Sequence, residues 1–155
     1  MGTFTAVCDA GHISSLESQN VILLVKAGLA YFAIVFSAGF MLGMVRVPFL
    51  VPHFGQRISE LIELPFMLAA IFIAARWIVR LFDLRRRPLL ALSIGTFAAV
   101  LLILVEFSVI LCVRGLTLSE FLATRDPIAA AFYYVAVAIF AGMPAIMSSA
   151  IGRSD

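Results

Sequence analysis

Four long apolar runs dominate this sequence, and their length constrains the fold more than any other feature. They fall at about residues 21–45, 64–82, 89–113 and 127–147 of a chain of 155 residues. A helix needs roughly 20 predominantly apolar residues to cross the hydrocarbon core of a bilayer. Each run is therefore long enough for one spanning helix, and we expect a single four-span domain over residues 1–155.

Composition points to the same class of protein. Hydrophobic residues make up 63% of the chain and charged residues 13%. Soluble domains are typically about 45–50% apolar and about 25% charged. A water-soluble core could not hide this much apolar surface, so lipid is the expected solvent. The expected fold is an all-α integral membrane four-helix bundle with short interfacial helices in the outer loops.

The two expected outer loops contain the features that suggest interfacial helices. Residues 46–65 include Pro48, Pro52 and Pro65, which we expect to break helix continuity. This apolar stretch is expected to lie on or dip into the membrane surface, with Pro65 in the first turn of the second span. Residues 117–124 carry a capping-box spacing followed by an apolar face, which predicts a short surface helix.

Basic residues predict the orientation, because short cytoplasmic loops carry an excess of Lys and Arg. Four spans put both termini and the turn at residues 83–87 on one side of the membrane. That side collects Lys26, Arg76, Arg80, Arg85, Arg86, Arg87 and Arg153, against Arg46, Arg57, Arg114 and Arg125 on the other. We therefore expect both termini in the cytoplasm, the loop at residues 46–65 outside, and the inner membrane of a bacterium as the location.

Ionisable residues are expected to gather in the outer half of the bilayer. Glu106 lies 17 residues after Leu89, the start of the third run, which is about 25 Å along a helix. At that depth we expect Glu106 to pair with Arg46 or Arg114. The predicted intramembrane polar cluster comprises Arg46, Glu60, Glu63, Glu106 and Arg114.

Two interpretations of this cluster remain open. Ionisable residues inside a membrane often form transport or proton-transfer sites, which favours a site that opens outward. The alternative is a structural ion pair that locks the first three helices together. Sequence alone favours the structural pair.

Small residues recur four positions apart in three of the runs. Such spacing lets helix backbones approach closely in lipid, although a Gly- and Ala-rich span also produces it by chance. The residues expected to pack helices together are Gly39, Gly43, Gly95, Ala138 and Gly142.

Little in the sequence indicates catalysis or a cofactor. We find no nucleophile–base pair, phosphate-binding loop, haem-ligand pair or metal cluster, and the two cysteines are too far apart to form a CxxC motif. His53 with Glu60 or Glu63 is a weak metal-ligand pattern. The net charge of +2 does not indicate a nucleic-acid partner. We expect no catalytic residue, no metal and no cofactor.

Two hypotheses about function follow. The first is a non-catalytic membrane protein that acts as a small assembly or accessory subunit, either of a larger membrane complex or of a homo-oligomer. The second is a small oligomeric transporter or channel with an outward-facing polar site formed by Glu106, Glu63 and Arg46. A membrane-embedded enzyme is the least favoured class. The lipid bilayer is the expected surrounding in each case, and the sequence names no small-molecule substrate.

Overall fold

The computed structural model describes residues 3–114 and 127–152, and describes side chains for residues 18–55, 58–109 and 131–152. The elements are α1 (Thr3–Val45), the π-helix η1 (Arg46–Leu50), α2 (Val51–Leu81), α3 (Pro88–Arg114) and α5 (Pro127–Ile151). These described residues contain no strand, which confirms the all-α prediction for them. Within the same part of the chain, four helices are long and apolar enough to cross a membrane.

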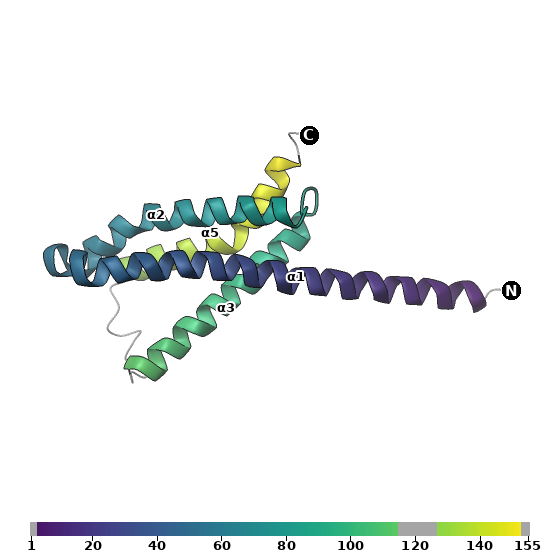
Figure 1. Ribbon diagram of the computed structural model, residues 1–155, viewed down its shortest axis with the longest axis horizontal. Helices are drawn as coiled ribbons and strands as arrows, with labels where there is room; N and C mark the ends of the chain where they lie inside the picture. The colour runs from purple at the N-terminus through teal and green to yellow at the C-terminus, as the bar shows by residue number, and fades with distance from the viewer. Residues whose placement is uncertain (1–2, 115–126, 153–155) are drawn as a thin grey trace.

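Each helix packs mainly against two others. The α1 helix packs against α2 and α3, and α5 packs against the same two helices. Figure 1 shows α1 and α2 as a long antiparallel hairpin, whereas α3 crosses α1 and diverges from it toward its C-terminal end. The apolar core lies near the turn between α2 and α3, and its larger members are Tyr31, Val35, Ile71, Ile78, Val79, Leu84, Ile94 and Phe140.

The turn between α2 and α3 is attached to the end of α5. Ser148 Oγ donates a hydrogen bond of 2.5 Å to the Leu84 carbonyl, and both residues are buried. The turn and the C-terminal end of α5 therefore lie at one end of the molecule. In Figure 1 the N-terminal part of α1 leaves the helix assembly at this same end.

The expectation that Pro48, Pro52 and Pro65 break helix continuity between the first two spans is wrong. The helix of α1 continues through η1, where the Val51 N–H bonds to the Arg46 carbonyl, and the chain reverses at Gly55. Gly55 has φ of 75° and ψ of 166°, a combination that side-chain-bearing residues rarely adopt. Pro65 lies inside α2 and does not start it. Residues 46–65, which we expected to form an outer loop, are thus the tip of a helical hairpin.

The positions of Pro48 and Pro52 explain why the helix continues past both residues. Pro52 lies two residues after the end of η1, so the altered hydrogen bonds of that π turn come directly before it. Pro48 lies within η1, and a π turn alters the local hydrogen-bond pattern so that the helix can continue. The first candidate span therefore runs over Ser18–Gly55 and the second over Ile58–Leu81, so both include part of the expected loop. The short helix expected at residues 117–124 lies outside the described residues.

Pro144 lies inside α5 and has no N–H to donate to the Phe140 carbonyl, four residues earlier. The Tyr31 hydroxyl donates to that carbonyl instead, over 3.0 Å. The rings of Tyr31 and Phe140 also stack, with centroids 4.6 Å apart. A side chain from α1 therefore replaces the hydrogen bond that α5 loses at its proline.

The glycines expected to pack helices together differ in how closely other helices approach them. A Cβ on Gly95 would collide with the Ala141 carbonyl, so α3 and α5 touch closely there. A Cβ on Gly39 would meet Met67 of α2 at ordinary contact distance, 3.4 Å. A Cβ on Gly43 or on Gly142 would meet nothing within 4 Å in the part of the chain that the structure describes. Gly95 and Gly39 thus contribute to packing between described helices, whereas Gly43 and Gly142 face open space.

Candidate functional site

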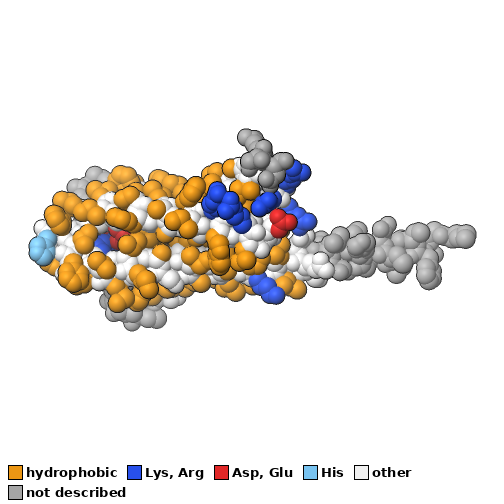
Figure 2. Space-filling model, turned by 45° about the horizontal axis from the view of Figure 1, so that its top comes forward, with side chains coloured by type: hydrophobic (Ala, Val, Ile, Leu, Met, Phe, Trp, Pro, Cys, Tyr) orange, Lys and Arg blue, Asp and Glu red, His pale blue; other side chains and the backbone are white. Residues whose placement is uncertain are grey.

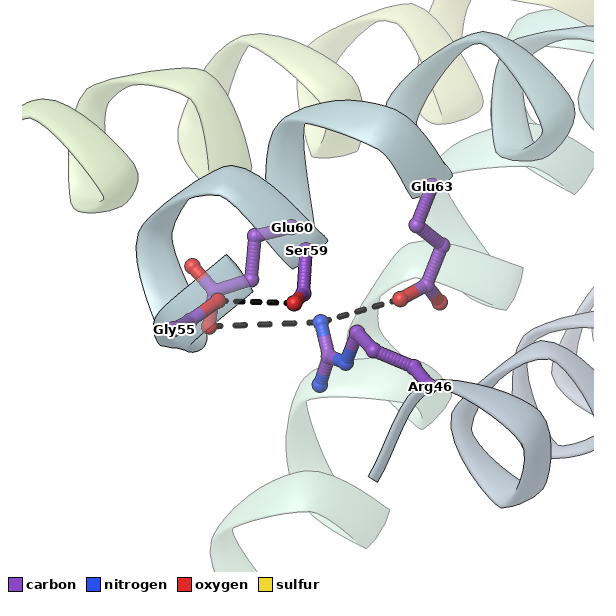
Figure 3. Close-up of polar contacts among 5 residues, drawn as sticks. All are labelled: Arg46, Gly55, Ser59, Glu60 and Glu63. Atoms are coloured by element: carbon purple, nitrogen blue, oxygen red, sulfur yellow. Dashed lines mark hydrogen bonds and ion pairs between the residues drawn. The ribbon is translucent and has the colours of Figure 1, made fainter. Parts of the chain in front are cut away.

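A charged cluster lies inside the tip of the α1–α2 hairpin. Arg46 Nη1 is 2.9 Å from Glu63 Oε2 and 3.9 Å from Glu60 Oε1. Figure 3 shows the guanidinium of Arg46 reaching across from η1 to the two carboxylates on α2. We call these three residues, Arg46, Glu60 and Glu63, the hairpin cluster.

Local structure explains how these residues meet. Glu60 and Glu63 are three positions apart on α2, so their side chains project from the same face of the helix. The reversal at Gly55 folds that face back toward the end of α1, where Arg46 begins η1. Ser59 is buried and donates from Oγ to the Gly55 carbonyl over 2.7 Å, which stabilises the first turn after the reversal.

The hairpin cluster is only partly accessible. The exposed fraction of the side chain is 27% for Arg46, 30% for Glu60 and 14% for Glu63. The Nε atom of Arg46 is buried and has no hydrogen-bond acceptor in the described structure. The two carboxylates thus share the Nη1 atom of one partly buried guanidinium.

Apolar side chains cover the outside of the hairpin tip. Val47, Phe49, Phe54 and Ile58 are all exposed. Figure 2 shows blue and red side chains set among orange ones near this end of the molecule. An ion pair in apolar surroundings is screened less than one in water, so the attraction between Arg46 and Glu63 is stronger than in a surface pair.

Glu106 belongs to a second polar site. Its Oε2 accepts a hydrogen bond from the Tyr133 hydroxyl of α5. The ion pairs that the structure shows for Arg46 go to Glu60 and Glu63 instead. Arg114 ends α3, and its side chain lies outside the described residues. The structure thus brings together three of the five predicted residues, Arg46, Glu60 and Glu63. It shows Tyr133, rather than Arg46, as a hydrogen-bond partner of Glu106.

Sequence reasoning missed Tyr133, although a signal was present. Glu106 lies eight residues before the end of α3, and Tyr133 lies six residues after the start of α5. Consecutive antiparallel helices place such positions at similar depth. A polar side chain on α5 at the depth of Glu106 was therefore a candidate partner.

His53 does not join a metal site. Its Nδ1 lies 2.9 Å from the Phe49 carbonyl, one turn earlier in the same helical run. The described residues contain no group of three or more His, Cys, Asp and Glu side chains that could hold a metal ion. Chemically, the hairpin cluster can hold charge, and its ion pairs can join η1 to α2.

Comparison with protein-family models finds no match, and comparisons with curated proteins and with solved structures find no significant similarity.

Proposed function

We propose that this chain is a non-catalytic membrane protein that acts as a small assembly or accessory subunit, in a larger membrane complex or in a homo-oligomer. Four candidate membrane-spanning helices support a multi-pass membrane protein. The location we propose is the inner membrane of a bacterium, and the basic residues favour both termini in the cytoplasm. The assembly role depends on how the small residues are placed.

The observation that carries the proposal is the open small-residue surface of α5. A Cβ added to Gly142 would meet no atom of the described residues within 4 Å, and Ala138, one turn earlier, is exposed. Gly95, the same residue type on α3, is in close contact with α5. Small residues allow helices in lipid to approach and gain van der Waals contact. The face containing Ala138 and Gly142 is therefore suited to a further helix.

The test is co-purification in mild detergent, followed by mass spectrometry and measurement of the oligomeric state. Gly142→Leu should reduce association with a stoichiometric partner or with a second copy. Ala69→Leu is the matched control, because Ala69 is an exposed small residue of α2 with no small residue four positions away. Equal association of wild type and both variants would contradict the assembly role.

A small oligomeric transporter or channel is the second candidate function. The observation that favours it is the pairing of two carboxylates, Glu60 and Glu63, with one guanidinium in the hairpin cluster. Ionisable groups in an apolar setting often mark a solute or proton pathway. Reconstituted liposomes test this candidate: a pH-dependent flux that is lost in Glu63→Gln and in Glu106→Gln, with both variants folded, would favour transport over assembly.

A further inference from the structure

The end of the molecule at the turn between α2 and α3, opposite the tip of the α1–α2 hairpin, carries a concentrated positive charge. Residues 76–87 contain five arginines and one acidic residue, Asp83. Figure 2 shows Lys and Arg side chains gathered toward this end of the molecule. Asp83 lies 4.0 Å from Arg85 Nε, and one carboxylate offsets only a small part of the charge of five arginines. We call residues 80–87 the basic turn.

Apolar side chains lie directly beside these cations. Arg76 and Arg80 are exposed and one helical turn apart on α2, and Trp77 and Leu81 are exposed next to them. Leu89, just after the basic turn, is 81% exposed. Cations adjoining an aromatic ring and aliphatic chains match an amphiphile with an anionic head and an apolar tail.

Hydrogen bonds fix the conformation of the basic turn. The N–H of Leu84 donates to the Val79 carbonyl over 3.0 Å, and the N–H of Arg87 donates to the Leu84 carbonyl over 3.1 Å. That carbonyl also accepts the hydrogen bond from Ser148 Oγ. A buried leucine thus anchors the turn to α5 while the arginines on either side remain exposed.

The backbone of the basic turn is held in an uncommon conformation. Asp83 has φ of 47° and Arg86 has φ of 65°, values that residues other than glycine seldom adopt. The end of α5 sits against the turn, because a Cβ on Gly152 would lie 3.1 Å from Arg86 Cγ. A topology signal requires positive charge but no fixed backbone. Strained conformations that the surrounding structure maintains occur preferentially at functional sites.

We propose that the basic turn binds the phosphate group of an anionic phospholipid headgroup. Arginine guanidinium groups bind phosphate oxygens through two parallel hydrogen bonds, and a fixed backbone sets their directions in advance. The acyl chains would lie along Trp77 and Leu89. This inference rests on the proposed membrane location and does not depend on the assembly role.

The experiment measures thermal unfolding of the purified full chain in a neutral detergent. Phosphatidylglycerol, phosphatidylcholine and inorganic phosphate are titrated separately. Phosphatidylglycerol should raise the melting temperature and saturate, whereas phosphatidylcholine and inorganic phosphate should have little effect. Equal shifts with both lipids, or a full shift with inorganic phosphate alone, overturn the proposal. Because the protein is purified without a partner, failure here is separate from failure of the assembly role.

Two variants distinguish a built site from diffuse attraction. Arg86→Gln should raise the half-saturating concentration of phosphatidylglycerol about fivefold, whereas Lys26→Gln, which removes one exposed cation from α1, should change it much less. Ser148→Ala keeps every arginine but releases the turn from α5, so it should also weaken the lipid effect. If Arg86→Gln fails to fold, Arg87→Gln replaces it. Equal effects of Arg86→Gln or Arg87→Gln and Lys26→Gln contradict a defined site.

Discussion

The Tyr31 hydroxyl donates to the Phe140 carbonyl, which is the acceptor that Pro144 leaves without its usual donor in α5. A buried carbonyl without a hydrogen bond costs about 1–3 kcal/mol. The tyrosine on α1 and the proline on α5 are thus complementary, although they lie far apart in the sequence. The same contact joins the first helix of the chain to the last.

This relationship predicts coupling between the two side chains. Tyr31→Phe should lower the free energy of unfolding by about 0.6 kcal/mol, the average for interhelical hydrogen bonds in membrane proteins, and by at most about 1.7 kcal/mol. In a Pro144→Ala background the restored N–H of residue 144 satisfies the carbonyl, so Tyr31→Phe should cost much less. A double-mutant cycle of unfolding in detergent measures the difference. Tyr134→Phe is the control, because Tyr134 is exposed; strict additivity of the two changes would show that the carbonyl does not depend on Tyr31.

The hairpin cluster predicts that its two glutamates are unequal. Glu63→Gln removes the carboxylate 2.9 Å from Arg46 and should lower the free energy of unfolding by about 1–3 kcal/mol. Glu60→Gln removes a carboxylate 3.9 Å away and leaves the closer pair of Arg46 with Glu63 intact, so it should be nearly silent or stabilising. Adding Arg46→Met to Glu63→Gln should recover part of the loss. Unfolding in detergent measures all three, and a greater loss for Glu60→Gln would contradict this account.

Two glycines predict opposite outcomes for the same substitution. Gly95→Ala places a methyl group against the Ala141 carbonyl, so α3 and α5 must separate. The expected cost is about 1–3 kcal/mol, as for other overpacked sites. Gly142→Ala places a methyl group more than 4 Å from every other described side chain and helix it could touch and should be neutral or slightly stabilising in isolated protein, since alanine favours the helix. Melting temperatures of the two variants provide the comparison, and similar values would contradict the close contact at Gly95.

The second polar site predicts how Glu106 behaves. Glu106→Gln keeps an oxygen that can accept from the Tyr133 hydroxyl, so the fold should tolerate it with a loss below about 1 kcal/mol. Glu106→Leu leaves that hydroxyl without this acceptor and should cost about 1–3 kcal/mol. Thermal unfolding separates the two variants. If Glu106→Gln is as damaging as Glu106→Leu, charge rather than hydrogen bonding matters at this position, and an ion pair becomes the better account.

The basic residues predict orientation in the membrane. Reporter domains fused after residue 155 or inserted at residues 83–88 should be cytoplasmic, and a reporter near residue 56 should be external, because positive charge is retained inside. Activity of paired cytoplasmic and external reporters in intact cells measures this. Opposite results at all three positions would reverse the orientation while leaving the four apolar helices in place.

The helical class could be predicted because it depends on long apolar runs, which a single sequence displays directly. The break expected at the prolines was wrong for a physical reason. Pro48 lies within a π turn and Pro52 comes just after it, and a local π turn accommodates a missing N–H within a continuing helix. Gly55, which contributes no side-chain signal, is where the chain reverses. Its positive φ is a property of the folded backbone that composition does not reveal.

The candidate site was only partly predictable. Arg46, Glu60 and Glu63 were among the five residues predicted from the sequence, and the structure pairs Arg46 with both glutamates because all three lie within a few turns of one reversal. Depth could not show which helix faces Glu106, since that depends on the rotation of α3 and α5 about their axes. The role of Tyr31 was also inaccessible, because it requires knowing that α1 passes Phe140.

The pairing of Arg46 with Glu63 has a consequence for biogenesis. Residues 46–63 contain two arginines and two glutamates, so the hairpin tip has no net formal charge. Moving one elementary charge across a membrane potential involves about 2.3 kcal/mol per 100 mV, and in a balanced tip these contributions cancel. The basic turn has no such balance. In the proposed orientation, the tip of the first hairpin would therefore cross as an electrically neutral unit, while the arginines of the basic turn would stay on the cytoplasmic side.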